Sequence, residues 1–196
     1  MDWCKFIISI LSNEKTWAIV GAISGAVAAI AALFTVYHAR SSWKEQIESN
    51  RPYFTITEPG IKSLPQSPPY RIQITMENIG IRPAYDLIGK IFIIDKNLES
   101  EPRFTFDFSV ANEIPPKTPT PWYNDTLRLP KNMPPQYIVF AIKYSDPVIN
   151  KSFTQVFFMK WDGVVNGVFD PNFVHVSIEE KQKIKDHLKD LLQNFT

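Results

Sequence analysis

Hydrophobic and polar residues follow two different patterns along this chain, and the first is a continuous apolar segment. Residues 17–37 carry no charged side chain. A helix of about 20 apolar residues crosses the roughly 30 Å hydrocarbon core of a bilayer. Trp17 and Tyr37 stand at the two ends of the segment, where aromatic rings favour the headgroup level. The pattern therefore predicts a transmembrane helix over residues 17–37.

Two other interpretations of residues 17–37 fit the sequence less well. A cleaved signal sequence has an apolar core of roughly 7–15 residues followed by a small-x-small cleavage site. The apolar run here is longer, and its small-x-small triplets lie inside it. A buried core helix would need a polar face, whereas only Ser24 and Thr35 are polar in this segment. We therefore expect a retained anchor in contact with membrane lipid.

One face of the predicted transmembrane helix carries small residues. Gly21, Gly25 and Ala29 follow one another at intervals of four. This spacing allows two helix backbones to approach closely in lipid. Glycine and alanine are also common in single-span helices without partners. The pattern leaves two alternatives, a homo-oligomer that associates through this face and a helix that stands alone.

The segments that flank the predicted anchor differ from it and from each other. Residues 1–16 have apolar side chains at helical spacing, which predicts a short amphipathic helix in the membrane interface; a frayed hydrophobic terminus is the alternative. Residues 38–51 are polar and contain neither glycine nor proline. We expect them to continue the helix as a stalk that ends ahead of Pro52, because the residue before a proline avoids the α conformation.

From residue 52 onward the apolar pattern alternates. Ile72, Ile74 and Met76 share one face of the segment 71–77, and three phenylalanines share one face of 103–108. Such alternation is typical of half-buried antiparallel strands. Residues 53–57 follow the same pattern, and the richer runs at 87–94, 137–144 and 153–161 are typical of central strands. The sequence therefore predicts a mainly β sandwich domain over residues 52–176.

A turn signature lies between two of the predicted strands. It consists of Asn78, Gly80, Pro83 and Ala84 in the spacing Asn-x-Gly-x-x-Pro-Ala. This segment resembles the turn of bacterial immunoglobulin-like sandwiches, including cell-adhesion-related domains. The order of one span, a short basic stalk, Arg-Pro and this domain is similar to small bacterial single-span membrane proteins. The resemblance implies an antiparallel immunoglobulin-like β-sandwich from Arg51 to about residue 161.

The turn residues have expected folding roles. Gly80 can supply the positive φ that a tight turn requires. Asn78 can bind loose backbone amides, and Ala84 can face the crowded space between two sheets. These roles concern architecture and do not indicate an activity.

Residues 111–136 depart from the strand pattern because they contain seven of the 16 prolines. They predict a long connecting loop, and a loop of this length in a compact domain is usually functional or disordered. Trp122 and Tyr123 lie between the prolines. They are candidates for a partner-binding loop; alternatively, they hold the loop against the edge of the sandwich.

The C-terminal pattern is helical again. Ser177 and Glu180 form a capping box, and apolar residues at helical spacing follow it. The pattern predicts one amphipathic helix over residues 177–196 that packs on its own domain, with a detachable partner helix as the alternative. Before it, Gly163 and Gly167 indicate a hairpin or bulge in residues 161–169.

Composition and charge narrow the possible chemistry. The 21 basic and 20 acidic residues nearly cancel, so we expect no nucleic-acid partner. The single cysteine, the three dispersed histidines and the lack of nucleophile-elbow or phosphate-loop motifs favour a protein that is not an enzyme and has no cofactor and no metal. Asp146, Asp162 and Asp170 could meet to bind calcium, but a structural role in turns is the favoured interpretation.

Topology and function follow from these elements. Basic residues are slightly more numerous after the span than before it, which favours an inner-membrane protein with a cytoplasmic C-terminal domain. The leading hypothesis is a membrane-anchored binding or sensing module that engages an unknown protein or ligand near the bilayer. The second is an oligomerising membrane effector of the bacterial defence type. An envelope protein with an external sandwich is a third.

Overall fold

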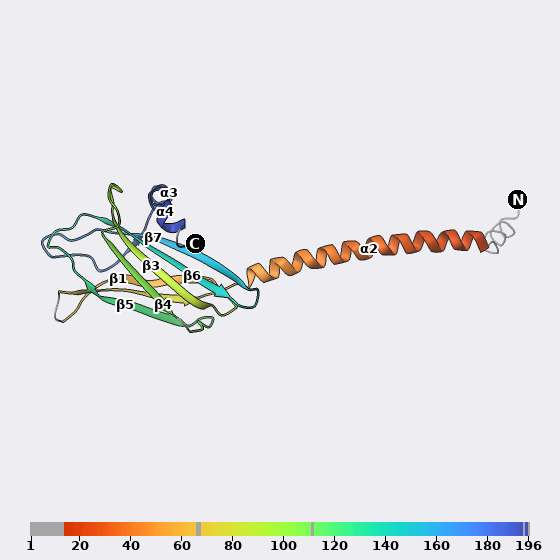
Figure 1. Ribbon diagram of the computed structural model, residues 1–196, viewed down its shortest axis with the longest axis horizontal. Helices are drawn as coiled ribbons and strands as arrows, with labels where there is room; N and C mark the ends of the chain where they lie inside the picture. The colour runs from red at the N-terminus through yellow and green to blue at the C-terminus, as the bar shows by residue number, and fades with distance from the viewer. Residues whose placement is uncertain (1–13, 66–67, 111, 194, 196) are drawn as a thin grey trace. The chain divides into compact units, whose positions relative to one another are not determined.

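The computed structural model describes residues 14–65, 68–110, 112–193 and 195 (Figure 1). They form two units, one that ends at Ser49 and one that begins at Asn50. The predicted amphipathic segment 1–16 lies outside the described residues except for its last three positions.

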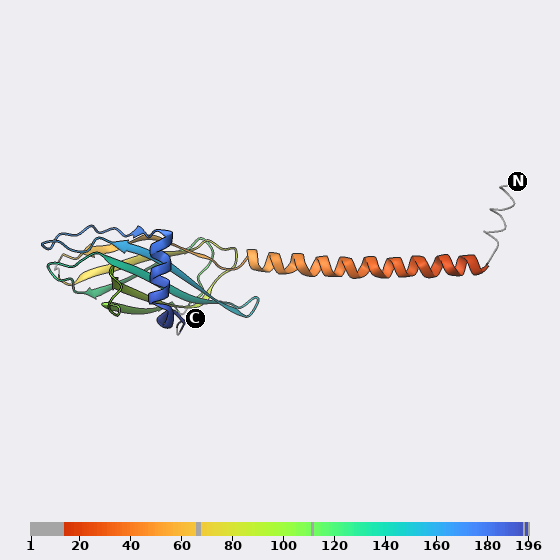
Figure 2. The ribbon, with the colours of Figure 1, turned by 90° about the horizontal axis from the view of Figure 1, so that it is seen from above.

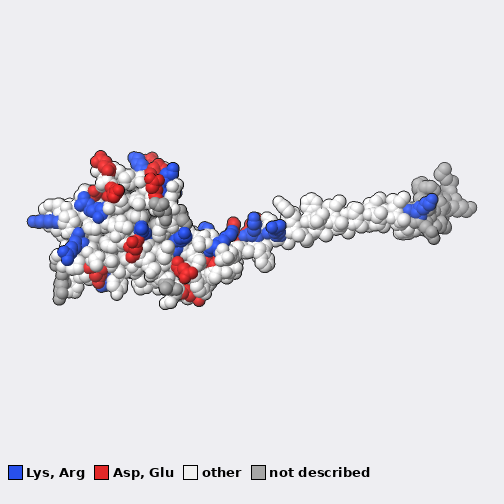
Figure 3. Space-filling view, viewed as in Figure 1, with Lys and Arg blue, Asp and Glu red and all other residues white. Residues whose placement is uncertain are grey.

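The first unit is the helix α2, Glu14–Ser49, which is 36 residues long. At 1.5 Å per residue it is about 54 Å in length. It runs through both the predicted anchor and the predicted stalk without a break, as expected for a stalk that continues the helix. Its part from Trp17 onward is long and apolar enough to cross a membrane. Figure 3 shows Lys and Arg near the two ends of α2 and an uncharged stretch between them.

The second unit contains two antiparallel β-sheets. The three-stranded sheet has the order β1-β2-β5, with bounds Phe54–Ser63, Tyr70–Asn78 and Pro119–Leu127. The five-stranded sheet has the order β4-β3-β6-β7-β8, with bounds Phe104–Val110, Tyr85–Asp95, Gln136–Asp146, Lys151–Trp161 and Val174–His175. The domain is therefore mainly β, as predicted.

The main core lies between the two sheets and is built from the predicted alternating faces. Ile72, Ile74 and Met76 of β2 are buried there, which confirms the predicted inward face of that strand. On β4 Phe108 is buried, and Phe104 and Phe106 are partly buried against the same core, so the three phenylalanines share the predicted inward face. A Cβ at Gly89 on the neighbouring strand would overlap the Phe108 ring, so the glycine makes room for an aromatic ring across the strand pair.

The loop predicted for residues 111–136 is wrong in its central part, because β5 occupies residues 119–127. Among the described strands β5 pairs only with β2 and forms an edge of its sheet. A proline cannot donate a backbone hydrogen bond, but an edge strand needs donors on one side only. Pro119 and Pro121 are therefore compatible with a strand at this position.

Two short helices follow the strands instead of the single predicted helix. α3, Ile178–His187, begins with the predicted capping box of Ser177 and Glu180, and its C-cap is Leu188. α4, Lys189–Gln193, follows directly. Ile184 and Leu188 are buried in a second, smaller core with residues of β3, β6 and β7. Figure 2 shows α3 lying across the strands of the five-stranded sheet. The apolar stripe thus packs on its own domain, as the favoured interpretation predicted.

The segment before these helices contains the predicted tight turn. Val165 and Val168 exchange backbone hydrogen bonds of 2.9 Å. Between them Asn166 and Gly167 have φ values of 53° and 80°. Two successive positive φ values are typical of a hairpin turn that suits the twist of β-strands. Of the hairpin or bulge expected in residues 161–169, the structure shows the hairpin turn.

Candidate functional site

The outer edge of β7 is open over half of its length. β7 pairs with β6 along all of its 11 residues. On the other side β8 pairs only with Met159 and Lys160. After His175 the chain turns into the N-cap of α3 at Ser177. Among the described residues no strand pairs with this side of residues 154–158, so their outward backbone groups are available to another chain.

A groove of about 500 Å³ runs along this open edge. We name it the edge groove; its lining residues are Arg51, Tyr53, Thr154, Gln155, Val156, Phe157, Phe158, His175, Val176 and Lys181. Five of these residues are consecutive in β7. Because side chains alternate between the two faces of a strand, five consecutive residues line one groove only when the groove follows the strand edge.

The charges that line the edge groove are all basic. Arg51 and Lys181 belong to the lining together with His175, and the lining contains no aspartate or glutamate. The Arg51 guanidinium lies 5.2 Å from the centroid of the Phe153 ring and 5.9 Å from that of Tyr53. Lys181 Nζ lies 5.6 Å from the Phe158 ring centroid. These cation–π contacts hold both cations beside the strand edge, and the edge groove is therefore suited to anionic groups.

One wall of the edge groove is fastened to β7 by a side-chain amide. The Phe54 backbone N–H donates to Gln155 Oε1 at 2.8 Å, and Gln155 Nε2 donates to the Phe54 carbonyl oxygen at 3.2 Å. The amide thus pairs with the backbone of β1 as a neighbouring strand would. The Tyr144 hydroxyl donates to the Pro52 carbonyl oxygen at 2.9 Å. Burial raises the pKa of Tyr144 to about 12, so this donor keeps its proton at physiological pH.

The opposite wall is the first turn of α3, which Glu180 attaches to the sheet. The Ser177 backbone N–H donates to Glu180 Oε2 at 2.7 Å. The same carboxylate lies 3.3 Å from Lys160 Nζ, and the Tyr137 hydroxyl donates to it at 3.4 Å. The pKa of Glu180 is lowered, chiefly by the Ser177 backbone N–H. Glu180 fixes the start of α3, and the next residue, Lys181, lines the groove.

Gly80, a predicted turn residue, lies against the chain that carries Arg51 and Tyr53 on one wall of the edge groove. Its role differs from the expected one. Its φ is not positive, so the expected positive-φ role is wrong. A Cβ at Gly80 would instead collide with the Arg51 carbonyl oxygen, with Pro52 and with the Tyr53 nitrogen. The glycine is required because the chain at residues 51–53 passes directly against it.

Asn78 caps loose backbone groups as predicted, and it is fully buried. Its Oδ1 accepts hydrogen bonds from the backbone nitrogens of Tyr53 at 3.2 Å and Gly80 at 3.0 Å. Its Nδ2 donates to the carbonyl oxygens of Arg82 at 2.8 Å and Ile114 at 3.2 Å. Ala84 is buried in the main core, as predicted. Pro83, between these residues, is half-buried.

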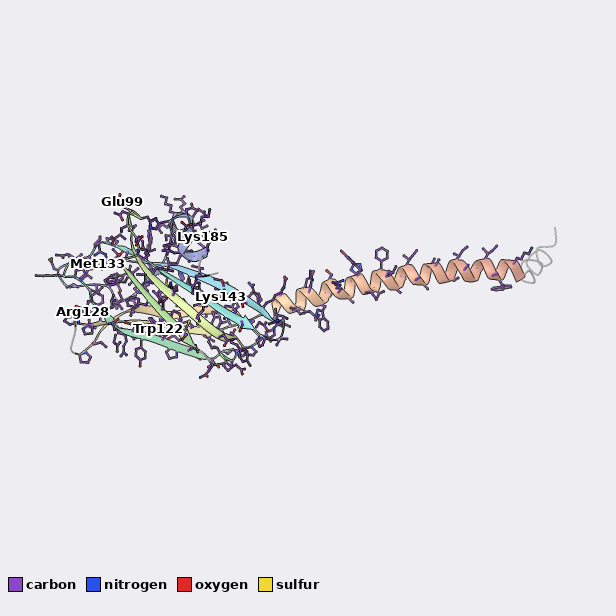
Figure 4. The ribbon with its side chains drawn as sticks, viewed as in Figure 1. Glu99, Trp122, Arg128, Met133, Lys143 and Lys185 are labelled. Carbon is purple, nitrogen blue, oxygen red and sulfur yellow. The ribbon has the colours of Figure 1, made fainter. Side chains whose placement is uncertain are left out.

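Trp122 and Tyr123 lie on β5, and they do not form one surface (Figure 4 labels Trp122). Neighbouring residues of a strand point to opposite faces. The Trp122 ring lies 4.9 Å from that of Phe108 and packs against the main core. Tyr123 is 58% exposed and lies under the Arg71 guanidinium at 4.3 Å. The structure replaces the expected binding loop with a strand, and a binding role for these residues stays a prediction.

The other candidate residues do not contribute to the edge groove. Gly21, Gly25 and Ala29 are exposed on α2, and a Cβ at either glycine would meet no atom within 4 Å apart from the adjacent backbone of its own helix. Asp146 forms an ion pair of 3.2 Å with Arg82. Within the described part of the chain no three acidic, histidine or cysteine residues gather as metal ligands. The three aspartates considered for calcium are therefore not assembled into a site.

Comparison with known proteins places the chain in a family. A family model described as a domain of unknown function, DUF8453, matches residues 16–164. The chain belongs to the DUF8453 family. The matched region of this DUF8453 protein includes α2 from its third residue onward, both sheets through β7, and Arg51 and Tyr53 of the edge groove. His175 and Lys181 lie beyond it. No curated protein matches the chain.

Sequence reasoning did not find the residues of the edge groove. Arg51 falls within the predicted stalk and Lys181 within the predicted C-terminal helix, and the sequence pattern singles out neither residue for binding. The one available signal was the shortness of the apolar stretch before the capping box, which leaves room for only a two-residue β8. That signal indicates that the last strand is too short to cover the strand beside it, but it does not indicate which strand has the uncovered edge.

Proposed function

We propose that the DUF8453 protein is a membrane-anchored binding module. In this proposal α2 crosses the inner membrane once, and an immunoglobulin-like β-sandwich, expected in the cytoplasm, binds a partner close to the bilayer. The observation that carries the proposal is the edge groove, where unpaired backbone of β7 lies beside basic side chains. Binding, without a chemical reaction, is what such a surface can do.

The exposure of α2 supports the membrane part of the proposal. None of the residues in its most apolar window is buried, whereas a core helix of a water-soluble protein would be covered. An uninterrupted apolar helix surface of this size is not stable in water. A bilayer covers such a surface without any further protein contact.

The strand order supports an immunoglobulin-like sandwich. The first, second and fifth strands form one sheet, and the third, fourth, sixth and seventh strands form the other, together with the two-residue β8 at its edge. With the strands lettered in chain order, this arrangement puts A, B and E opposite C, F and G, as in immunoglobulin domains, with the fourth strand added beside C. The sheets also pack over a shared core of inward-facing residues.

Topology is the first test of the anchor. Reporters that are active on only one side of the membrane are fused before Met1 and after Thr196. We expect the C-terminal reporter to be active in the cytoplasm and the chain to remain in the membrane fraction at high salt. An external C-terminal reporter would favour the envelope hypothesis. A shortened, soluble product would show that the apolar helix is a cleaved signal sequence and would overturn the anchor.

Site-specific photo-crosslinking tests the edge groove in intact membranes. A photoreactive phenylalanine analogue replaces Tyr53, which lines the groove and is 45% exposed, or Tyr123, which is 58% exposed on β5. We expect a discrete adduct from position 53 and none from position 123. Equal labelling from both positions, or none from position 53, would contradict a binding role for the groove.

An oligomerising membrane effector is the second candidate function, and the open glycine face of α2 is the observation that favours it. In this hypothesis a signal sensed by the sandwich makes the helices associate and perturb the bilayer. Replacement of Gly21 and Gly25 by leucine removes the close approach of two helices. Ala31→Leu is the matched control, since Ala31 lies on another face of the helix. Toxicity or signalling that survives the double substitution would exclude this function.

A further inference from the structure

We infer that the partner of the DUF8453 protein presents an extended acidic segment, which pairs with residues 154–158 of β7 as an added strand. The inference rests on the proposed function and names the class of partner. The added segment would occupy the position next to β7 where β8 ends.

The backbone of β7 provides the first argument. β8 supplies only two residues of the neighbouring strand, and the chain then leaves the sheet for α3. The five residues from 154 to 158 measure about 17 Å at 3.4 Å per residue. An extended peptide of about five residues can pair with this length of edge, and main-chain hydrogen bonds then provide affinity without sequence specificity.

A comparison of two sheet edges provides the second argument. Proteins protect exposed edges from unwanted pairing with prolines, charges or covering elements. β5, an edge of the other sheet, carries Pro119 and Pro121. β7 contains no proline between its first and last residue. The open half of β7 is thus not blocked against pairing with another strand. The nearby basic side chains favour an added strand that is negatively charged.

The distribution of charge provides the third argument. Arg51 stands on one wall of the edge groove and Lys181 on the other, with no acidic residue in the lining. Successive side chains of an extended peptide point to opposite sides. Neighbouring acidic residues on an added strand would therefore reach both walls. Carboxylates match the planar guanidinium of arginine especially well.

An anionic lipid headgroup is the competing ligand for these basic residues. A phosphate group would neutralise Arg51 and Lys181, but it would leave the backbone groups of residues 154–158 unpaired. An acidic peptide satisfies the basic side chains and the strand edge together. The peptide is therefore the ligand that the whole groove favours.

Peptide binding to the full chain tests this inference. The protein is reconstituted in phosphatidylcholine nanodiscs, and fluorescence anisotropy follows a seven-residue peptide of valine and glutamate in which the glutamates form neighbouring pairs, so that they point to both sides of an extended strand. The first comparison peptide has glutamine in place of glutamate, and the second is the acidic peptide with alternate backbone nitrogens methylated. We expect saturable binding of the acidic peptide and at least about tenfold weaker binding of each comparison peptide.

Three variants locate the site. Arg51→Gln and Lys181→Gln are each expected to weaken binding of the acidic peptide about two- to fivefold, as is typical of partly exposed ion pairs. Lys185→Gln is the matched control: Lys185, labelled in Figure 4, is an exposed lysine on α3. It is not among the residues that line the edge groove, and its replacement should leave affinity unchanged. Amide hydrogen exchange of residues 154–158 should slow when the peptide is bound.

Several results would overturn the inference. Equal affinity for the glutamine peptide would exclude recognition of charge, and equal affinity for the methylated peptide would exclude strand addition. Absence of peptide binding, together with binding to phosphatidylserine vesicles that Arg51→Gln and Lys181→Gln weaken, would assign the groove to lipid. In each case an adduct from position 53 in the crosslinking experiment would still support the proposed binding function, so the two failures are distinguishable.

Discussion

Replacement of the buried Asn78 by alanine should destabilise the sandwich and disturb the edge groove. Four hydrogen bonds of 2.8–3.2 Å are lost at once, two accepted by its carbonyl oxygen and two donated by its amide nitrogen. One net hydrogen bond contributes about 0.5–1.5 kcal/mol, and an unpaired buried group costs about 1–3 kcal/mol. Because three of the four bonds are only partly buried, water can replace some of them, and we expect a loss of about 4 kcal/mol.

The free energy of unfolding of the full chain in detergent, measured by tryptophan fluorescence in urea, checks this value. Asn124→Ala is the matched control, because Asn124 on β5 receives only two local bonds from exposed Thr126; its cost should stay below about 1 kcal/mol. Asn78 Oδ1 also accepts a hydrogen bond from the backbone N–H of Tyr53, which lines the edge groove. The variant should therefore weaken crosslinking from position 53 at temperatures where it is folded. Equal destabilisation by the two substitutions would refute the role assigned to Asn78.

Three further outcomes follow from the contacts. Gly80→Ala should lower the free energy of unfolding in urea by at least about 2 kcal/mol, since the new Cβ meets the backbone of residues 51–53. Ile184→Ala should cost about 2–4 kcal/mol because Ile184 is fully buried, whereas Leu191→Ala, at a 41% exposed side chain, should cost much less in the same assay. The pKa of Glu180 is lowered from its ordinary 4.5, so its stabilisation is present at neutral pH and disappears as the pH falls below 4.5. Urea titrations at several pH values should show a shallower loss of stability at acid pH in Glu180→Gln; an unchanged pH profile would contradict this assignment.

Elements that depend on neighbours in the sequence were predictable from the sequence. α2 follows from an uncharged run and a polar continuation without glycine or proline, up to the residues before Pro52. β2 follows from strict alternation, which fixes the face of Ile72, Ile74 and Met76 once one side is buried. The start of α3 follows from the capping box. Each of these patterns acts within a few residues, so local chemistry decides it.

Other features depend on what lies beside a residue in space. The prolines of β5 indicated a loop, but their effect on a strand depends on whether it has one neighbour or two. Gly80 was correctly singled out, but for a positive φ; the actual cause is the close passage of residues 51–53. The predicted C-terminal helix is interrupted at Leu188. The burial of Leu188 agrees with the predicted apolar stripe, but the interruption of the helix was not visible in the sequence pattern.

The sequence by itself determined the apolar helix, the strand-forming segments and the capped C-terminal helix. The tertiary structure alone decided where the sheet stays open and which charges face that opening. Arg51 precedes the first strand and Lys181 follows the last, and no local pattern connects them. They line one groove because the order of strands makes β7 the neighbour of a β8 that is too short to cover it. Strand pairing is a long-range property, and a site formed by an unpaired edge exists only after the sheets have assembled.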